Sequence, residues 1–182
     1  MNTVQPIRDK NKIRKIENIL KKQSMRNYIL FELGIYSGLR ISDILKLKVK
    51  DLKDKDYFIL KEQKTGKHKK LAINPKLKKE LDMYLSNMKD DEYIIKSREG
   101  ENKPISRVMA WKILNDAAKK VGIQEIGTHS LRKTFGYHAY LQTNKDITKI
   151  QKLLNHSSPE VTLRYIGITQ DDLDDVVINL SY

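Results

Sequence analysis

The sequence contains no cysteine, which excludes disulfide bonds and thiolate metal sites. It also lacks any run of about 20 apolar residues, the length that a membrane-spanning helix needs. The first six residues have no apolar core of the kind found in secretion signals. At 182 residues the chain is still long enough to bury a hydrophobic core. We therefore expect one domain, spanning residues 1–182, in a cytoplasmic protein.

Positive charge is concentrated in the first part of the chain. The formal net charge is +13 at pH 7 and the sequence pI is about 9.7. Residues 1–80 hold 22 Lys+Arg against 9 Asp+Glu, an excess of 13, whereas residues 81–182 hold 14 of each. A polyanion such as DNA is the natural partner of such a half. A lysine-rich solubilising surface explains the charge equally well, so charge alone leaves both interpretations open.

Apolar residues recur with helical spacing along most of the chain, which predicts a mainly α fold with a small antiparallel β-sheet (α+β). Ser24 and Asp146 suit helix N-caps, and Gly38 suits the end of a nearly all-apolar helix. Trp111 is expected in the core, and His138 is expected to be structural. Helices are predicted over residues 9–23, 24–37, from 42 or 43, 75–88, 104–122, 130–142, 146–156, 159–165 and 169–180, with strands at 57–60 and 70–73 and a short strand or extended segment at 92–95.

The stretch from residue 127 to residue 165 contains His129, Arg132, His156 and Tyr165, with apolar helical segments between them. His129 and Arg132 are three positions apart, so on a helix their Cβ atoms lie about 5–6 Å apart on one face. His156 follows a periodic apolar segment, and Tyr165 follows another that begins with Pro159, a residue suited to a first helical turn. Taken singly, each has an ordinary explanation as a core aromatic, a helix cap or a salt-bridge partner.

Together these residues form a recognisable pattern. His-x-x-Arg, then Leu-x-His-Ser-Ser, then a tyrosine nine residues after the second histidine resembles the catalytic half of the tyrosine recombinases, the phage-integrase family. Residues 37–47, which contain Arg40, resemble that family's first arginine box, and residues 63–67 resemble its lysine-bearing β-hairpin. The resemblance implies a tyrosine-recombinase catalytic domain. It also implies site-specific DNA recombination, integrase- or invertase-like, through a covalent 3′-phosphotyrosyl intermediate.

The resemblance makes Tyr165 the nucleophile that attacks a DNA phosphodiester. Arg40 and Arg132 are then the cations on the non-bridging oxygens. They suit this role because a guanidinium holds two oxygens at once and keeps its proton. Phosphoryl transfer of this kind depends mainly on positioning and on charge.

Three further residues complete the catalytic set that the resemblance implies. His129 is the base that takes the phenol proton. Lys64 is the acid for the departing 5′ oxygen, because a lysine beside two arginines should have its pKa pushed down. His156 hydrogen-bonds the phosphate. The set requires neither a metal nor another cofactor.

A turn signal at Thr65-Gly66 predicts a hairpin with a lysine-rich tip. Lys67, Lys69 and Lys70 are candidates for contacts with DNA phosphates, as is Arg107 on a later helix; solvated surface charge is the more frequent explanation for the latter. The expected partners are double-stranded DNA and further copies of the chain, as a tetramer on DNA and weakly associated or monomeric without it. No membrane partner is expected.

The sequence departs from the family pattern in three places. Asn155 stands where the family usually has glycine before the second histidine, and asparagine also tolerates positive φ. Only about 39 residues precede Arg40, so no N-terminal core-binding domain is expected. The apolar face of the predicted helix at 169–180 either docks on a neighbouring subunit or folds back on its own core; it comprises Leu173, Val176, Val177 and Leu180.

Two alternatives to an active recombinase remain open. The first is a non-catalytic or regulatory DNA-binding protein with the same fold, which the basic first half favours. The second is an enzyme of the related type IB topoisomerase chemistry, which relaxes supercoils. We rank the second last because the Leu-x-His-Ser-Ser element points to the recombinases.

Overall fold

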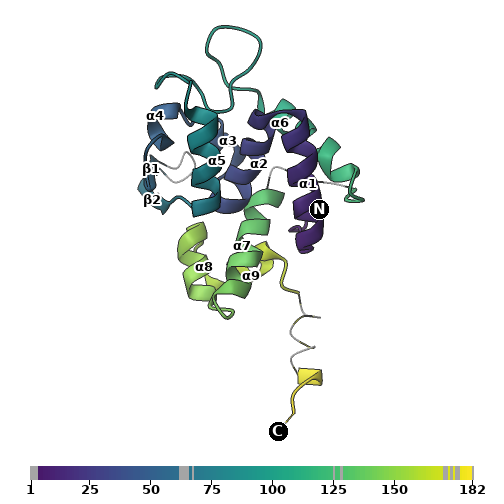
Figure 1. The fold of residues 1–182 in the computed structure, drawn as a ribbon. Helices are drawn as coiled ribbons and strands as arrows, with labels where there is room; N and C mark the ends of the chain where they lie inside the picture. The colour runs from purple at the N-terminus through teal and green to yellow at the C-terminus, as the bar shows by residue number, and fades with distance from the viewer. Residues whose placement is uncertain are drawn as a thin grey trace.

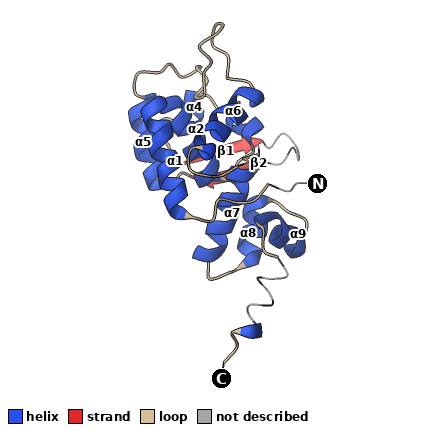
Figure 2. Cartoon of the chain, turned by 90° about the vertical axis from the view of Figure 1, so that its right-hand side faces the viewer, coloured by secondary structure: helices blue, strands red, loops and turns tan. Residues whose placement is uncertain are grey.

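The computed structural model describes residues 4–61, 66, 68–124, 126–127, 129–169, 172, 174 and 177–181. In these residues helices dominate, and one hairpin forms the sheet (Figure 1; Figure 2). The elements in order are α1 (Lys10–Gln23), α2 (Met25–Ser37), α3 (Ile41–Ile44), α4 (Val49–Leu52), β1 (Tyr57–Lys61), β2 (His68–Ala72), α5 (Pro75–Leu85), α6 (Arg107–Lys119), α7 (Ser130–Gln142), α8 (Ile147–Leu154) and α9 (Pro159–Ile166).

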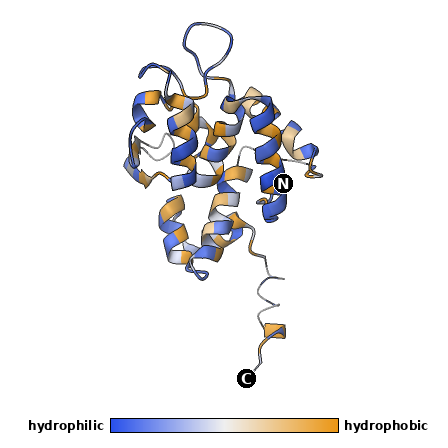
Figure 3. Cartoon of the chain, in the orientation of Figure 1, coloured by the Kyte–Doolittle hydropathy of each residue, from blue (hydrophilic) through white to orange (hydrophobic). Residues whose placement is uncertain are grey.

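Helix α2 forms the centre of the core. Eight of its 13 residues are buried, and it contacts α1, α3, α5, α6 and α7. The helix ends at Gly38, whose φ of 62° is left-handed and suits a residue without Cβ. The apolar positions of the surrounding helices alternate with hydrophilic ones, as Figure 3 shows. The predicted apolar helix and its glycine stop are confirmed.

A second, smaller hydrophobic cluster joins α7, α8 and α9 below the main core in Figure 1. Ile150, Leu154 and Ile166 are fully buried there. Gly136 permits this packing, because a Cβ at that position would lie 2.7 Å from Ile166 Cγ2 and 3.0 Å from Leu154 Cδ1. Helix α7 therefore spans both clusters and fixes α8 and α9 against the rest of the molecule.

The antiparallel sheet is confirmed, with a register that pairs Tyr57 with Ala72 and Lys61 with His68. The second strand begins two residues earlier than predicted and ends one residue earlier. The Ile73 amide still donates to the Asp56 carbonyl at 2.8 Å, just beyond the strand. Residues 62–65 and 67, including most of the predicted hairpin tip, lie outside the described residues.

Several predicted boundaries were wrong. Helix α6 begins at Arg107 and not at Pro104, because the Ser106 side chain caps it by accepting from the Met109 amide. Pro104 instead forms an isolated bridge with Lys96. Helix α5 ends at Leu85, short of residue 88, and residues 92–95 form no regular strand, only a bridge between Tyr93 and Lys48.

Trp111 was expected in the core, but its side chain is 43% exposed. Helix α6 packs inward through Ala110, Leu114 and Ala117, which are buried. Trp111 lies about 100° around the helix from Ala110 and therefore faces outward. Five of the twelve residues of the predicted C-terminal helix at 169–180 lie outside the described residues, among them Leu173 and Val176 of its apolar face.

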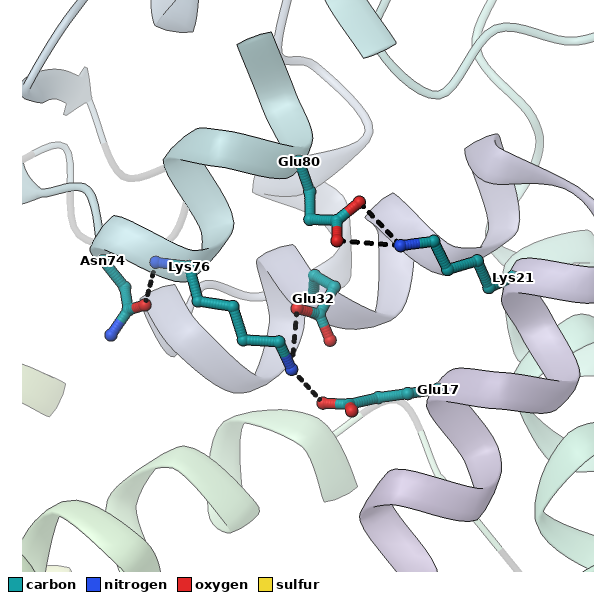
Figure 4. A network of polar contacts seen from close by, with 6 residues as sticks. All are labelled: Glu17, Lys21, Glu32, Asn74, Lys76 and Glu80. Atoms are coloured by element: carbon teal, nitrogen blue, oxygen red, sulfur yellow. Dashed lines mark hydrogen bonds and ion pairs between the residues drawn. The ribbon is translucent and has the colours of Figure 1, made fainter. Parts of the chain in front are cut away.

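A polar cluster connects α1, α2 and α5 (Figure 4). Lys76 Nζ lies 2.8 Å from Glu17 Oε1 and 3.6 Å from Glu32 Oε2. Lys21 Nζ lies 2.8 Å from Glu80 Oε1. Glu32 is fully buried. Burial, and next the nearby Glu17 carboxylate, raise the pKa of Glu32 to about 8.

The raised pKa of Glu32 predicts a pH-dependent stability. Between pH 4.5, the ordinary pKa of the group, and about pH 8, the folded state binds more protons than the unfolded chain. The contribution of Glu32 to the free energy of unfolding therefore falls as pH rises through that window. A Glu32→Gln variant lacks this dependence. Urea unfolding at pH 5.5 and 8 should therefore show the variant gaining roughly 1–3 kcal/mol relative to wild type at the higher pH.

The matched control is Glu101→Gln, which removes an exposed carboxylate from the loop before α6. Its difference from wild type should stay constant with pH. A Glu32→Gln variant that parallels wild type at both pH values would contradict the assignment of the bound proton to Glu32.

Candidate active site

Arg132 is the most buried of the predicted site residues, with 2% of its surface exposed. It lies in the first turn of α7. Its Nη1 donates to the Gly38 carbonyl and its Nη2 to the Leu154 carbonyl, both at 2.5 Å. The guanidinium thus connects the end of α2 to the end of α8, and the two carbonyls fix the orientation of its plane.

One carbonyl belongs to a residue with left-handed backbone, and the other belongs to the residue just before one. Gly38 itself has positive φ, and Leu154 is followed by Asn155, with φ 52° and ψ 47°. The prediction that Asn155 tolerates positive φ is confirmed. Beyond it, the His156 amide donates to the Gln151 carbonyl at 3.0 Å, which closes the end of α8.

Arg40 lies at the N-cap of α3 in extended backbone, with φ −71° and ψ 147°. Its carbonyl accepts from the Asp43 and Ile44 amides at 2.9 and 3.0 Å, which fixes the backbone, and its side chain is half-buried. The Arg40 guanidinium is close enough to Tyr165 to lower the pKa of that phenol. Arg40 and Arg132, 92 positions apart in the sequence, therefore lie around one phenol.

The two histidines flank Tyr165. His129 is the N-cap of α7 and makes no side-chain capping bond. Its Nδ1 lies 3.3 Å from Tyr165 Oη. The His156 ring meets the Tyr165 ring edge to face, with centroids 4.7 Å apart, while His156 Nδ1 lies 3.2 Å from Thr162 Oγ1. Four predicted residues, Arg40, Arg132, His129 and His156, thus surround the phenol of the fifth, Tyr165.

Opposing effects set the acidity of Tyr165. Burial raises the pKa of the phenol, while the positive charges of Arg132 and Arg40 lower it, and a hydrogen bond from Arg132 acts in the same direction as these charges. The net shift is upward. A phenol in this state needs a neighbouring base to react near neutral pH, and His129 Nδ1 is within hydrogen-bonding reach.

The remaining predicted residues lie elsewhere or are not described. Lys64 and Lys67 fall outside the described residues, as does the side chain of Lys69. Lys70 is exposed on β2, with Nζ 3.7 Å from the centroid of the Tyr57 ring. Arg107 is exposed at the start of α6. Their roles at DNA stay predictions.

Sequence reasoning missed two buried charged residues next to the site. Asp43 is 3% exposed, one turn after Arg40, and Lys133 is 7% exposed, directly after Arg132. A buried charge is costly, and both follow a predicted arginine within three positions, so their proximity to the arginines was the available signal. His138, outside the site, contacts the Ile7 carbonyl through Nε2 at 2.9 Å.

Within the described residues, no three His, Asp or Glu side chains are grouped so that they could hold a metal ion. The helices in the same part of the chain are all too short or too polar to cross a membrane. The described residues of the site provide a phenol, two imidazoles and two guanidinium groups, with Lys133 beside them.

This fold is that of a tyrosine recombinase catalytic domain. The family model described as "Phage integrase family" matches residues 8–171, and the chain belongs to that family, as the resemblance implied. It is 52% identical to "Probable integrase/recombinase YoeC" of Bacillus subtilis, a match that covers 94% of this chain and 93% of that protein. The predicted enzyme class, a tyrosine site-specific recombinase, is confirmed.

More distant relatives are longer than this chain. The chain is 30% identical to "Tyrosine recombinase XerA" of Pyrococcus furiosus, a match that covers 91% of this chain but 58% of that protein. Among solved structures, XerA recombinase superposes with a TM-score of 0.78 at 21% identity, covering 100% of this chain and 66% of that one. The predicted fold class is thereby confirmed.

The left-handed residue before His156 gives a prediction about backbone strain. Asn155→Gly should unfold close to wild type, because glycine adopts positive φ without a Cβ clash. Asn155→Val should lose about 1–2 kcal/mol, the cost of a left-handed conformation for a branched residue. Urea unfolding of the two variants measures the difference, and equal stabilities would show that φ at this position carries no strain.

Proposed function

We propose that this chain cuts and rejoins DNA through a covalent bond between Tyr165 and a DNA 3′ phosphate. The observation that supports this most strongly is the convergence of Arg40, Arg132, His129 and His156 around the Tyr165 phenol. These two arginines and two histidines come from three separate parts of the chain, the N-cap of α3, the start of α7 and the residue pair after α8, and α9 brings Tyr165 to them.

In the proposed reaction, the Tyr165 oxygen attacks the scissile phosphorus. A phosphorus–oxygen bond to the phenol forms as the bond to the 5′ oxygen breaks. His129 takes the phenol proton, and Lys64 supplies a proton to the departing 5′ oxygen, which leaves as a free hydroxyl. The phosphotyrosine ester keeps the energy of the broken diester, so a second strand's 5′ hydroxyl can reverse the step without an added energy source.

The arginines hold the phosphoryl group during this exchange. Arg132 is fixed by two backbone carbonyls, and such preorganised donors cost no rearrangement as negative charge develops. Arg40 approaches from the N-cap of α3. His156, positioned through Thr162, is the further hydrogen-bond donor to the phosphate. Removal of one such donor typically costs about 10²–10³ in rate.

The proposed partner is double-stranded DNA, and the proposed location of the protein is the cytoplasm. Structurally similar proteins have been solved as "XerH site-specific recombinase bound to difH substrate" and as "a lambda integrase tetramer bound to a Holliday junction". By analogy we propose that this chain assembles as a tetramer on DNA.

The proposed contacts with DNA phosphates are Lys67, Lys69, Lys70 and Arg107. We also propose that residues 1–182 form one catalytic domain.

A DNA-binding regulator that uses the same fold without the chemistry is the second candidate. The charge distribution favours this candidate. Residues 1–80 carry an excess of 13 positive charges, which equals the net charge of +13 of the whole chain. Such a half binds phosphates whether or not a phosphodiester is cut.

The proposed nucleophile is tested with a suicide substrate, a duplex nicked near the cleavage site so that the cut product is lost. Incubation with wild type should give a covalent protein–DNA adduct that survives denaturing electrophoresis. Tyr165→Phe removes only the phenol oxygen and should abolish the adduct, while Tyr57→Phe, on exposed β1, should leave it unchanged. An adduct that persists in Tyr165→Phe rules out Tyr165 as the nucleophile.

Both candidate functions require binding to DNA phosphates, and they differ in whether a covalent adduct follows. Charge-driven binding should weaken with salt, with a slope of about −0.9 in log K against log salt for each phosphate contacted. Lys70→Gln should reduce that slope by about one. Salt-dependent binding without an adduct on any nicked site would favour the regulator, and a slope near zero would contradict phosphate contact in both candidates.

A further inference from the structure

Lys133 is a buried lysine in contact with the proposed nucleophile. It follows Arg132 on α7, and only 7% of its surface is exposed. Lysine is almost never fully buried unless its charge is paired, because the ammonium loses its hydration. The position of Lys133 therefore calls for a specific compensating interaction.

The compensating group is an aromatic ring. Lys133 Nζ lies 5.3 Å from the centroid of the Tyr165 ring, within the range of a cation–π contact. Among the described residues, no carboxylate forms an ion pair with it. Burial lowers the pKa of the Lys133 ammonium. The ring of Tyr165 thus provides the interaction that a carboxylate provides for most buried lysines.

We propose that Lys133 is a positioning residue that holds the Tyr165 ring for attack and favours the ionised phenol through its positive charge. The proposal rests on the proposed function only in taking Tyr165 as the nucleophile. A cation over a ring is held more strongly when the phenol loses its proton, because the ring then carries negative charge. The contact therefore strengthens along the reaction, which is the requirement for catalysis.

Lys133 acts beside other charged and titratable groups that face Tyr165. These are Arg40 before α3, Arg132 on α7, His129 at the N-cap of α7 and His156 after α8. The charges of the two arginines lower the pKa of the phenol. His129 Nδ1 lies 3.3 Å from the phenol oxygen, and the rings of His156 and Tyr165 meet edge to face. Lys133 is the cation that the structure records over the ring face.

The direct test follows the Tyr165 phenol in the DNA-free protein. All nine tyrosines are replaced by 3-fluorotyrosine, which ionises more readily than tyrosine, and the ¹⁹F signal of residue 165 is assigned by its loss in Tyr165→Phe. Lys133→Met removes the charge but keeps an unbranched apolar chain. We expect the pKa of residue 165 to rise in Lys133→Met and to stay at the wild-type value in Lys133→Arg.

The matched control is Lys152→Met, which removes one positive charge from an exposed position on α8. It should leave the titration of residue 165 unchanged. Unfolding by urea checks that each variant folds, and Lys133→Gln replaces the methionine variant if that one does not. An unchanged titration in a folded Lys133→Met or Lys133→Gln variant would overturn the proposal.

A second readout uses single-turnover adduct formation on the nicked duplex as a function of pH. In Lys133→Met the rising limb should move to higher pH, with the rate near neutral pH falling about 2- to 30-fold, and Lys133→Arg should restore it. A merely structural lysine would lower the rate equally at every pH, which would contradict the proposal. If wild type forms no adduct, the proposed function fails while the fluorine titration still decides the role of Lys133.

Discussion

The guanidinium of Arg132 is the constraint on which the site depends. It is almost completely buried and bonds the carbonyl of Gly38 at the end of α2 and that of Leu154 at the end of α8. A buried charge with too few partners would destabilise the fold, so the two carbonyls have to be presented to it. The same two hydrogen bonds hold α7 against the ends of α2 and α8. Arg40 follows α2, His156 follows α8, and the next helix, α9, carries Tyr165.

The bonds of Arg132 to the ends of α2 and α8 explain why the small cluster of α7, α8 and α9 is packed so closely. Gly136 leaves no room for a side chain between α7 and its two neighbours, so α9 lies directly against the helix that carries Arg132. Tyr165, in the last turn of α9, is then held near the arginines by packing as well as by polar contacts. Its burial opposes ionisation, and the surrounding cations oppose that effect. The balance of these two effects is the physical basis of the proposed reactivity.

Local chemistry made much of this predictable. Asp9, Asp146 and Ser158 cap helices through their side chains, and Pro159 occupies a first turn, all within the reach of sequence rules. The extent of α7, residues 130–142, was predicted from its apolar periodicity, and the left-handed Asn155 from the residue type. The family pattern then indicated which polar residues should converge, although their catalytic roles stay predictions.

Tertiary packing decided the features that sequence could not give. The outward orientation of Trp111 depends on which face of α6 meets the core, and both faces carry apolar residues. The proton on Glu32 depends on burial against Glu17, which is 15 positions away in the sequence. The contact between Lys133 and Tyr165 joins two residues 32 positions apart, and nothing in the sequence places one against the other.

We propose that Arg40 and Arg132 hold one DNA phosphate while Tyr165 lies in position to attack it. The most direct measurement is mass spectrometry of the trapped protein–DNA adduct after nuclease and trypsin treatment. Cleavage after Arg164 gives a C-terminal peptide of residues 165–182, which contains two tyrosines, Tyr165 and Tyr182. The account predicts a nucleotide on Tyr165. A nucleotide on Tyr182, or on a peptide from elsewhere in the chain, would contradict it.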